Sequence, residues 1–210
     1  MTDEKRPYRK KRRAELEALT ARRITESAVE LHGTLGPSRT SISAVAKHAG
    51  VRRSTLYRYF PDEAALFAAC TAHWMNANPF PELDRWAAIV DPDERLAVAL
   101  LELYAHYGHT RQMMENILRD EATMPIVKQL LGGYRDYLGA ARDTLVGGRR
   151  PRGGARKDVV AAIGHALAFA TWHSLTREQG LDNAEAADLM HRLVAIATIG
   201  RHPSGRAAGT

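Results

Sequence analysis

Residues 41–60 read SISAVAKHAGVRRSTLYRYF, and this stretch decides the fold. Its first half has apolar side chains spaced three and four residues apart, which predicts a short helix with one apolar face; they are Ile42, Val45, Ala46 and Ala49. Gly50 follows, and glycine can end a helix in the left-handed conformation without strain. A second helix, from about Arg53 to Phe60, carries basic, hydroxyl and aromatic groups outward. Two short helices joined by a glycine turn indicate a helix-turn-helix, whose second helix suits the DNA major groove.

The order of residues around this stretch resembles the N-terminal signature of the tetracycline-repressor (TetR) family of bacterial regulators, which here spans roughly Ile24 to Leu66. The residues that carry the resemblance are Val45-Ala46, Ala49-Gly50-Val51, Thr55-Leu56-Tyr57, Tyr59-Phe60 and Leu66. The resemblance implies an all-α homodimer. Its N-terminal three-helix, homeodomain-like helix-turn-helix domain precedes a C-terminal helical bundle for dimerisation and ligand binding. Three residues depart from the family's pattern: His32 replaces a core aromatic, Arg52 a small hydroxyl residue, and Glu63 a lysine near a phosphate.

The positive charge is concentrated at the front of the chain. Residues 1–60 hold 14 Lys or Arg against 6 Asp or Glu, whereas the remaining 150 residues hold 16 against 18. A polyanion is therefore the expected partner of the N-terminal domain alone. We expect a disordered basic arm at 1–13 that adds phosphate or minor-groove contacts, a DNA-binding domain at 14–61, a ligand-binding and dimerisation domain at 62–202, and a tail at 203–210.

The DNA contacts follow from side-chain chemistry and from the resemblance. Arg53 and Arg58 can bind guanine O6 and N7 or grip phosphates, and Tyr57 and Tyr59 can each offer a hydroxyl to a phosphate. One of the two tyrosines is expected to pack on the domain core as well. A solvated helix face is the alternative reading. The resemblance implies DNA contacts at Ser41, Arg53, Ser54, Thr55, Tyr57, Arg58 and Tyr59, with Ser43 and Arg52 as weaker candidates.

Apolar periodicity and capping residues predict the other helices. The first runs from about Ala14 to His32, with a stripe of Leu16, Leu19, Ile24, Ala28 and Leu31. Ser41 lies where its hydroxyl could cap the helix that follows it. Further helices are expected to start at the caps Asp62, Asp91, Thr110 and Thr123, and the helix that starts at Asp91 is expected to end near Gly108. The last two are expected at about 157–179 and 183–201, the latter opened by an Asp182–Glu185 capping box.

A ligand pocket is expected among methionine and aromatic side chains of the C-terminal helices, although packing of a plain core is the alternative for each one. The candidates are Tyr104, Tyr107, Met113, Met114, Tyr134, Tyr137 and Trp172. The final helix pair has wide apolar faces, which suit a four-helix bundle across a two-fold axis or burial within one monomer. The arginine-rich stretch 147–156 is predicted to be a solvated loop rather than a second nucleic-acid contact.

Other features exclude several function classes. The single Cys70 rules out an internal disulfide and a multi-cysteine metal site, and its apolar neighbours predict a buried, inert thiol. No apolar run reaches the length of a membrane span, so no membrane partner and a cytoplasmic location are expected. His32 is expected to be a satisfied ring rather than a pH switch. The chain shows no nucleophile with its base, no metal cluster and no phosphate-binding glycine loop, so neither an enzyme nor a cofactor is expected.

The prediction for function is a TetR-type regulator, in the first place a repressor, that binds a palindromic operator as a homodimer. An unidentified small-molecule effector would bind in the C-terminal domain and change the operator affinity. The alternative is a constitutive or architectural DNA-binding protein without an effector. The two differ in one observable property, a ligand-dependent change in DNA affinity.

Overall fold

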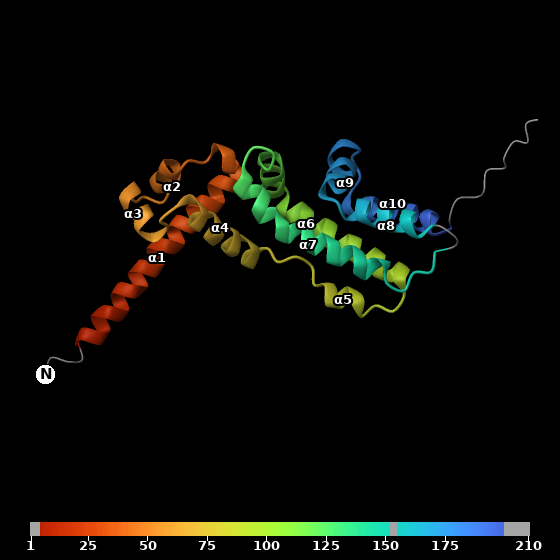
Figure 1. The fold of residues 1–210 in the computed structure, drawn as a ribbon, viewed down its shortest axis with the longest axis horizontal. Coiled ribbons are helices and arrows are strands. Elements are labelled where there is room, and N and C mark those ends of the chain that lie inside the picture. Colours follow the sequence, from red (N-terminus) through yellow and green to blue (C-terminus); the bar gives the residue numbers. More distant parts are fainter. Residues whose placement is uncertain (1–4, 152–154, 200–210) are drawn as a thin grey trace, which may run out of the picture. The chain divides into compact units, whose positions relative to one another are not determined.

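The computed structural model of the chain describes residues 5–151 and 155–199, with side chains for 10–151 and 155–198 (Figure 1). Every regular element in these ranges is helical, which confirms the all-α fold class. The elements are α1 (Lys5–Thr34), η1 (Pro37–Arg39), α2 (Ile42–His48), α3 (Arg53–Tyr59), α4 (Glu63–Ala77), α5 (Leu83–Ala87), α6 (Pro92–Asp120), α7 (Pro125–Val146), α8 (Arg156–Leu167), α9 (Phe169–His173), η2 (Ser174–Glu178) and α10 (Asn183–Ile199).

The helices form two compact units. In the described ranges the first unit comprises residues 5–79 and 111–130, and the second comprises 80–110, 131–151 and 155–199. The first unit therefore extends past the domain boundary expected after residue 61, because α4 belongs to this unit. Leu66 and Cys70 of α4 are buried in the same core as Ile24 of α1, which explains the difference. The expected tail, 203–210, lies outside the described residues.

The core of the first unit is small and follows the apolar periodicity. Its buried members come from α1, α2, α3, α4 and residues that flank these helices: Ile24, Ala28, Val45, Ala46, Ala49, Leu56, Phe60, Leu66 and Cys70. Gly50 has φ +63°, the left-handed conformation predicted for the turn. Val51 N donates to Ala46 O at 2.9 Å and closes the end of α2. These contacts fix α3 against α2 through apolar packing and one turn.

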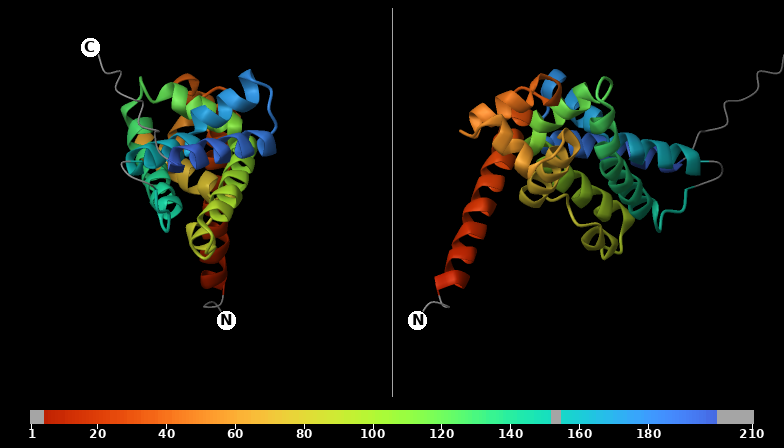
Figure 2. Two further views of the ribbon diagram at one scale, coloured as in Figure 1. Left: turned by 90° about the vertical axis from the view of Figure 1, so that its right-hand side faces the viewer. Right: turned by 60° about the vertical axis from the view of Figure 1, so that its left-hand side comes forward.

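Helix α1 begins at Lys5, so residues 5–13 are helical rather than a disordered arm. Lys, Arg, Ala, Glu and Leu all favour helix, and Arg13 pairs with Glu17 at 3.0 Å one turn later. The expected apolar stripe is wrong at its start, because Leu16 and Leu19 are 57% and 62% exposed. Figure 2 shows α1 running on beyond α2, α3 and α4, so nothing in the first unit covers these two leucines.

Helix α6 is continuous from Pro92 to Asp120, and the predicted break at Gly108 and Thr110 is wrong. Thr110 Oγ1 donates to His106 O at 2.8 Å, a bond within the helix, so it caps nothing. Gly108 lies inside the helix without a positive φ, and a Cβ there would lie at an ordinary contact distance, 3.5 Å, from the Asn183 side chain. Thr123 likewise does not cap α7, which begins at Pro125, a residue favoured at the first helical position.

The predicted helix 157–179 is interrupted. Ala168 has φ −70° and ψ 134°, an extended conformation that separates α8 from α9, and η2 follows as a π-helical turn. Three capping predictions are confirmed: Asp62 Oδ1 accepts from Ala65 N, Asp91 Oδ1 accepts from Asp93 N, and Asp182 and Glu185 exchange two hydrogen bonds. Two short elements, η1 and α5, have no counterpart among the predictions; the fully buried Trp86 holds α5 in place.

Two buried arginines hold the ends of α6 and α7 together in the second unit. Arg95 donates to the carbonyl oxygens of Ile89, Thr144 and Gly147 at 2.7 to 3.0 Å. Arg149 pairs with Asp93 at 2.7 Å and is only 9% exposed. The stretch after α7 is irregular where it is described, as predicted, but Arg149 is not solvated. Residues 152–154 of that loop lie outside the described residues.

Arg95→Met is expected to lower the free energy of unfolding by about 3 to 5 kcal/mol, because several buried carbonyl oxygens lose their donor at once. Urea unfolding followed by circular dichroism measures the change. The matched control is Arg85→Met, since Arg85 is 68% exposed and pairs with Glu102 on the surface. That pair is worth at most about 1 kcal/mol. Equal losses in the two variants would contradict the role of Arg95.

Candidate nucleic-acid interface

The start of α2 is exposed and capped. Ser41 Oγ accepts a hydrogen bond from Ala44 N at 3.1 Å, which makes Ser41 the N-cap of α2, as predicted. Ser43 is exposed in the first turn of the same helix. Both serines therefore present polar atoms to solvent beside α3, at the edge where a phosphate backbone would approach a helix-turn-helix.

Helix α3 divides its side chains between the core and solvent. Leu56 is fully buried and Phe60, the residue after the helix, is 9% exposed. One of the two tyrosines was expected to pack on the core. Tyr59 does so and is half-buried, whereas Tyr57 is 38% exposed. Of the other candidates, Thr55 is half-buried and four are exposed: Arg52, Arg53, Ser54 and Arg58. Most of the predicted contact residues on α3 are therefore exposed to solvent.

Each arginine within α3 is braced by a tyrosine. Arg53 donates to the Tyr57 hydroxyl at 3.1 Å, and its guanidinium lies 5.4 Å from the centre of that ring. Arg58 donates to the Tyr59 hydroxyl at 3.2 Å, with its guanidinium 5.0 Å from the ring centre. Cation–π contact and hydrogen bond together restrict the long arginine side chains. A restricted side chain loses less conformational entropy when it binds a base edge or a phosphate.

The turn between α1 and α2 is held by the last residues of α6, which belong to the same unit. Asn116 Nδ2 donates to the carbonyl oxygens of His32 and Gly33, at 3.1 and 2.7 Å. Arg119 donates to Leu35 O at 3.1 Å, and Asp120 accepts from Ser38 N at 2.9 Å. We call these three α6 residues the clasp. Sequence reasoning missed it, because its partners lie more than 80 residues apart and are backbone atoms.

The clasp is charged and internally paired. Arg119 binds Asp120 with two hydrogen bonds, at 2.8 and 3.2 Å. Burial by itself raises the pKa of Asp120, but hydrogen bonds from Arg119 and Ser38 outweigh it and leave the pKa below its usual value. Asp120 therefore remains an acceptor at neutral pH. Gly36 lies under this pair with φ +95°, and a Cβ there would collide with the Arg119 guanidinium.

His32 lies beside the clasp at the end of α1. It is 6% exposed and its ring stacks on Phe67 of α4, with 4.8 Å between ring centres. Burial lowers the pKa of His32 to about 4, although the charge of Asp120 acts in the opposite direction. The imidazole is therefore neutral at pH 7 and takes the place of a core aromatic ring. This agrees with the expectation of a packed ring.

Between pH 7 and 4.5 the free energy of unfolding is expected to fall by about 2 kcal/mol through His32 alone. The folded-state pKa lies below the unfolded value, so the unfolded chain binds the proton first and stability is lost as the pH falls from about 6.5 towards 4. His32→Phe should remove this part of the pH dependence, whereas His48→Gln, on the exposed surface of α2, should keep it. Urea unfolding at the two pH values tests this, and parallel curves for His32→Phe and the native protein would contradict it.

The predicted ligand residues separate between the two units. Met113 and Met114 are buried in the first unit, and Met113 lies close to Gly33. The five aromatic candidates are in the second unit, together with two rings that the sequence prediction did not include, Phe80 and Phe169. We call this set the aromatic cluster: Phe80, Tyr104, Tyr107, Tyr134, Tyr137, Phe169 and Trp172.

Hydroxyls of the aromatic cluster bind the broken end of α8. Tyr104 donates to Ala166 O at 2.8 Å, and Tyr107 donates to Leu167 O at 2.7 Å. These carbonyl oxygens would accept backbone N–H groups if α8 continued, so the tyrosines replace the missing helical bonds. The Tyr107 and Tyr134 hydroxyls lie 2.9 Å apart, and burial raises the pKa of both. No proline or glycine marks this break, which is why periodicity predicted one helix.

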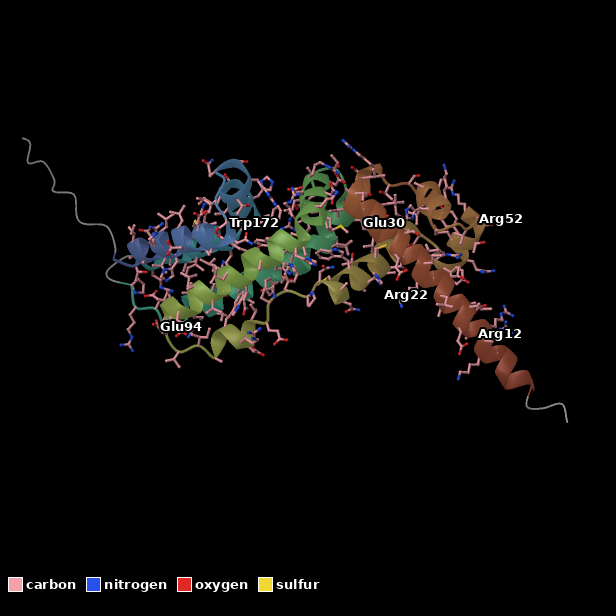
Figure 3. All side chains as sticks on the ribbon, turned by 180° about the vertical axis from the view of Figure 1, so that it is seen from behind. Arg12, Arg22, Glu30, Arg52, Glu94 and Trp172 are labelled. Atoms are coloured by element: carbon pink, nitrogen blue, oxygen red, sulfur yellow. The ribbon has the colours of Figure 1, made fainter. Side chains whose placement is uncertain are left out.

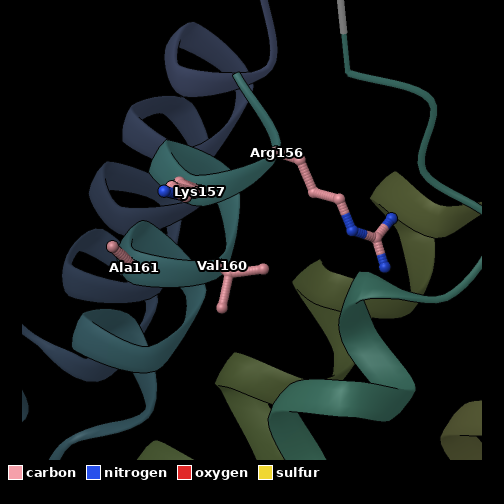
Figure 4. A pocket seen from close by; sticks show the side chains of 4 residues that line it. All are labelled: Arg156, Lys157, Val160 and Ala161. Carbon is pink, nitrogen blue, oxygen red and sulfur yellow. The ribbon is translucent and has the colours of Figure 1, made fainter. Parts of the chain in front are cut away.

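A separate shallow pocket of about 550 Å³ lies at the start of α8 (Figure 4). It is lined by Arg156, Lys157, Val160 and Ala161, none of which is a predicted ligand residue. Among the described residues no three His, Cys, Asp or Glu side chains gather closely enough to hold a metal ion. No single helix in the described part of the chain has the length and apolar character to cross a membrane; α8 with Phe169–Glu178 meets both only as a pair bent by 62°.

Comparison with known proteins gives one family match and two curated relatives. Residues 24–70 match the model of the family described as bacterial regulatory proteins, tetR family. Two Mycobacterium tuberculosis proteins, from strains CDC 1551 and H37Rv, are each 35% identical over 82 residues, and each is named an uncharacterized HTH-type transcriptional regulator. The match covers 39% of this chain and 41% of each relative, so the chain matches about two fifths of their length.

Solved structures share the fold over most of the chain. A TetR-like transcriptional regulator from Rhodococcus sp. RHA1 has a TM-score of 0.63 and 21% identity, covering 88% of this chain and 98% of that one. The multidrug binding protein EbrR, solved with imidazole, has a TM-score of 0.51 and 18% identity, covering 82% and 93%. At these identities the likeness concerns the arrangement of helices.

Proposed function

Because the chain belongs to the TetR family and carries that family's DNA-binding helix-turn-helix, we propose that it is a repressor that occupies a palindromic operator as a homodimer. The observation that carries the proposal is the exposed face of α3, where Arg53 and Arg58 are each braced by a tyrosine. Guanidinium groups held in this way suit guanine edges and phosphates. The excess of positive charge in residues 1–60 adds a general attraction for DNA.

A homodimer supplies the sequence discrimination that one short helix lacks. Helix α3 has seven residues and reads few base pairs, whereas two copies related by a two-fold axis read a palindrome. The surface proposed for the contact is the outward face of α8 and α10, which pack on each other within the second unit. Leu193 and Ile196 of α10 are 45% and 65% exposed, and Ala161 of α8 is exposed too. A second copy would bury these apolar side chains.

The proposed effector site is the aromatic cluster of the second unit. It offers apolar ring faces and, between them, hydroxyls that hold the carbonyl oxygens at the end of α8. A flat, mostly apolar molecule with one or two hydrogen-bonding groups matches these side chains, and its polar groups would compete for the same hydroxyls. EbrR, which shares the fold, was solved with imidazole, a small aromatic ring.

Helix α6 is the proposed route from effector to operator. It carries Tyr104 and Tyr107 of the aromatic cluster and, further along, Asn116 and Asp120 of the clasp. A change in α6 at its tyrosines would alter how firmly the clasp holds the turn before α2. Coupling of this kind typically changes affinity by a free energy of about 1 to 3 kcal/mol.

A gel-shift titration of the purified protein against the DNA upstream of its own gene tests the proposed function. The expected result is a discrete complex that survives an excess of unrelated duplex, with sedimentation showing two copies of the chain in it. A library of small aromatic compounds is then screened for release of the complex. Binding that disappears with competitor would reject the repressor, and specific binding that no compound changes would favour the constitutive alternative.

A further inference from the structure

The part of α1 from Lys10 to Leu19 does not pack on the core of the first unit. The earliest residue of α1 that packs on it is Ala21, and every side chain from Lys10 to Leu19 is exposed. At 1.5 Å per residue, residues 5–19 extend about 22 Å beyond the packed part of the helix. We call residues 5–19 the α1 extension. The exposed side chains from Lys10 to Leu19 are therefore available to a partner.

The α1 extension is basic around its whole circumference. Lys10, Lys11, Arg12 and Arg13 are consecutive, and successive residues of a helix are turned by about 100°. Only Glu15 and Glu17 oppose them between residues 10 and 19. Figure 3 shows Arg12 and Arg22 along α1 and Arg52 at the start of α3. Arg22 pairs with Glu26 at 2.7 Å, so the excess of positive charge on α1 is concentrated in the α1 extension.

Two exposed leucines, Leu16 and Leu19, lie among the charged side chains of the α1 extension. Arg12, Leu16, Leu19 and Arg23 are spaced four, three and four residues apart, so they share one face of the helix. On this face an apolar pair lies between two guanidinium groups. DNA grooves accept that combination, since arginines bind the phosphates at the groove edges and apolar side chains contact sugars or thymine methyl groups.

We propose that the α1 extension is a second DNA-contacting surface, which binds the duplex beside the base pairs that α3 reads. Charge complementarity favours this partner, and the α1 extension belongs to the same unit as α3. An acidic membrane surface is less suited, because an interfacial helix needs a broad apolar face and the α1 extension has charges on all sides. The inference rests on the proposed function, because it adds a contact to the same complex.

The test compares Lys10→Gln/Lys11→Gln/Arg12→Gln with a control that removes the same charge from exposed positions of the second unit, Arg85→Gln/Arg150→Gln/Arg177→Gln. The probes are the protein's own upstream DNA in a 40-base-pair duplex and the same sequence trimmed to the protected core. On the long duplex, the slope of log affinity against log salt should become shallower by about 0.9 for each phosphate that the variant no longer neutralises, or about 5.4 for a dimer whose two chains each lose three phosphate contacts. The control should keep the native slope, and trimming the DNA should remove the difference between variant and native protein.

A second measurement locates the contact directly. Ala18→Cys with an attached iron chelate is expected to cleave the duplex outside the segment that α3 protects. Cys70 does not interfere, because it is 4% exposed and burial raises the pKa of its thiol to about 12. Cleavage confined to the α3 segment, or none, would overturn the inference.

The outcomes separate the inference from the function on which it rests. If the triple variant binds both duplexes like the native protein, the α1 extension does not contact DNA, while the operator complex stands. If the native protein fails to form a competitor-resistant complex, the proposed function fails first. A triple variant that binds DNA normally but no longer binds vesicles of phosphatidylcholine and phosphatidylglycerol would assign the α1 extension to a membrane surface and reject the proposal.

Discussion

Arg53→Ala is expected to weaken operator binding by about 10- to 100-fold for each recognition helix, and by the square of that factor when two helices bind one operator. The substitution removes a guanidinium that is exposed on α3. The operator therefore loses a hydrogen-bond donor whose conformation Tyr57 already restrains. The fold should not change, because Arg53 makes no contribution to the core of the first unit. Gel-shift titration gives the affinity, and thermal unfolding serves as the check on folding.

Tyr57→Phe separates the contribution of the Tyr57 hydroxyl to operator affinity from that of the Tyr57 ring. Phenylalanine keeps the ring under the guanidinium but lacks the hydroxyl that accepts from Arg53 at 3.1 Å. A loss of about 3- to 10-fold in affinity is expected, the value of one hydrogen bond. Arg177→Ala, an exposed arginine of η2, is the matched control and should bind like the native protein. Native affinity in both α3 variants would show that this face of α3 does not read the operator.

Gly36→Ala is expected to lower the free energy of unfolding by about 3 kcal/mol or more. The backbone at residue 36 has φ 95° and ψ 156°, a conformation open essentially only to glycine, which costs other residues about 1 to 3 kcal/mol. The new Cβ would also collide with the Arg119 guanidinium and lie 2.8 Å from Asp120 Oδ2. Both groups are bound in the clasp, so neither can move away without breaking hydrogen bonds. Urea unfolding measures the change.

Gly50→Ala is the matched control for this prediction. Gly50 also has a positive φ, +63°, but a Cβ there meets nothing within 4 Å. Gly50→Ala is therefore expected to lower the free energy of unfolding only by the cost of the left-handed conformation, about 1 kcal/mol. Combining Gly36→Ala with Arg119→Ala should restore part of the stability, since it removes one of the colliding groups. Equal stability of the Gly36→Ala and Gly50→Ala proteins would contradict the role given to the clasp.

The sequence was sufficient for the parts of the fold that local physics determines. The helix-turn-helix followed from spacing and one glycine, and the caps Ser41, Asp62 and Asp182 followed from short-range hydrogen bonding. Long-range contacts could not be predicted in this way. Ala168 breaks a periodic helix because tyrosines some 60 residues away bind the freed carbonyl oxygens, and Arg149 is buried because Asp93 pairs with it.

The candidate interface, too, could be predicted only where local periodicity determines which side chains face the core. Exposure of Arg52, Arg53, Ser54 and Arg58 follows from the inward direction of Leu56, which periodicity gives. Periodicity also misassigned Leu16, because an apolar stripe cannot reveal where its partner surface ends. The arginine–tyrosine contacts on α3 and the clasp on the turn could not be predicted from the sequence, because they depend on the directions of side chains in the folded structure.

The clasp also affects which residues of the turn can change during evolution. Its α6 side chains grip main-chain atoms of the turn, the oxygens of His32, Gly33 and Leu35 and the amide of Ser38. Nearly any amino acid supplies those atoms, so Leu35 and Ser38, whose side chains are exposed, are free to drift in an evolving lineage. Gly36 and the buried Pro37 are exceptions within the turn. Selection should therefore act on α6 and on these two residues, and leave the exposed positions of the turn open to new contacts.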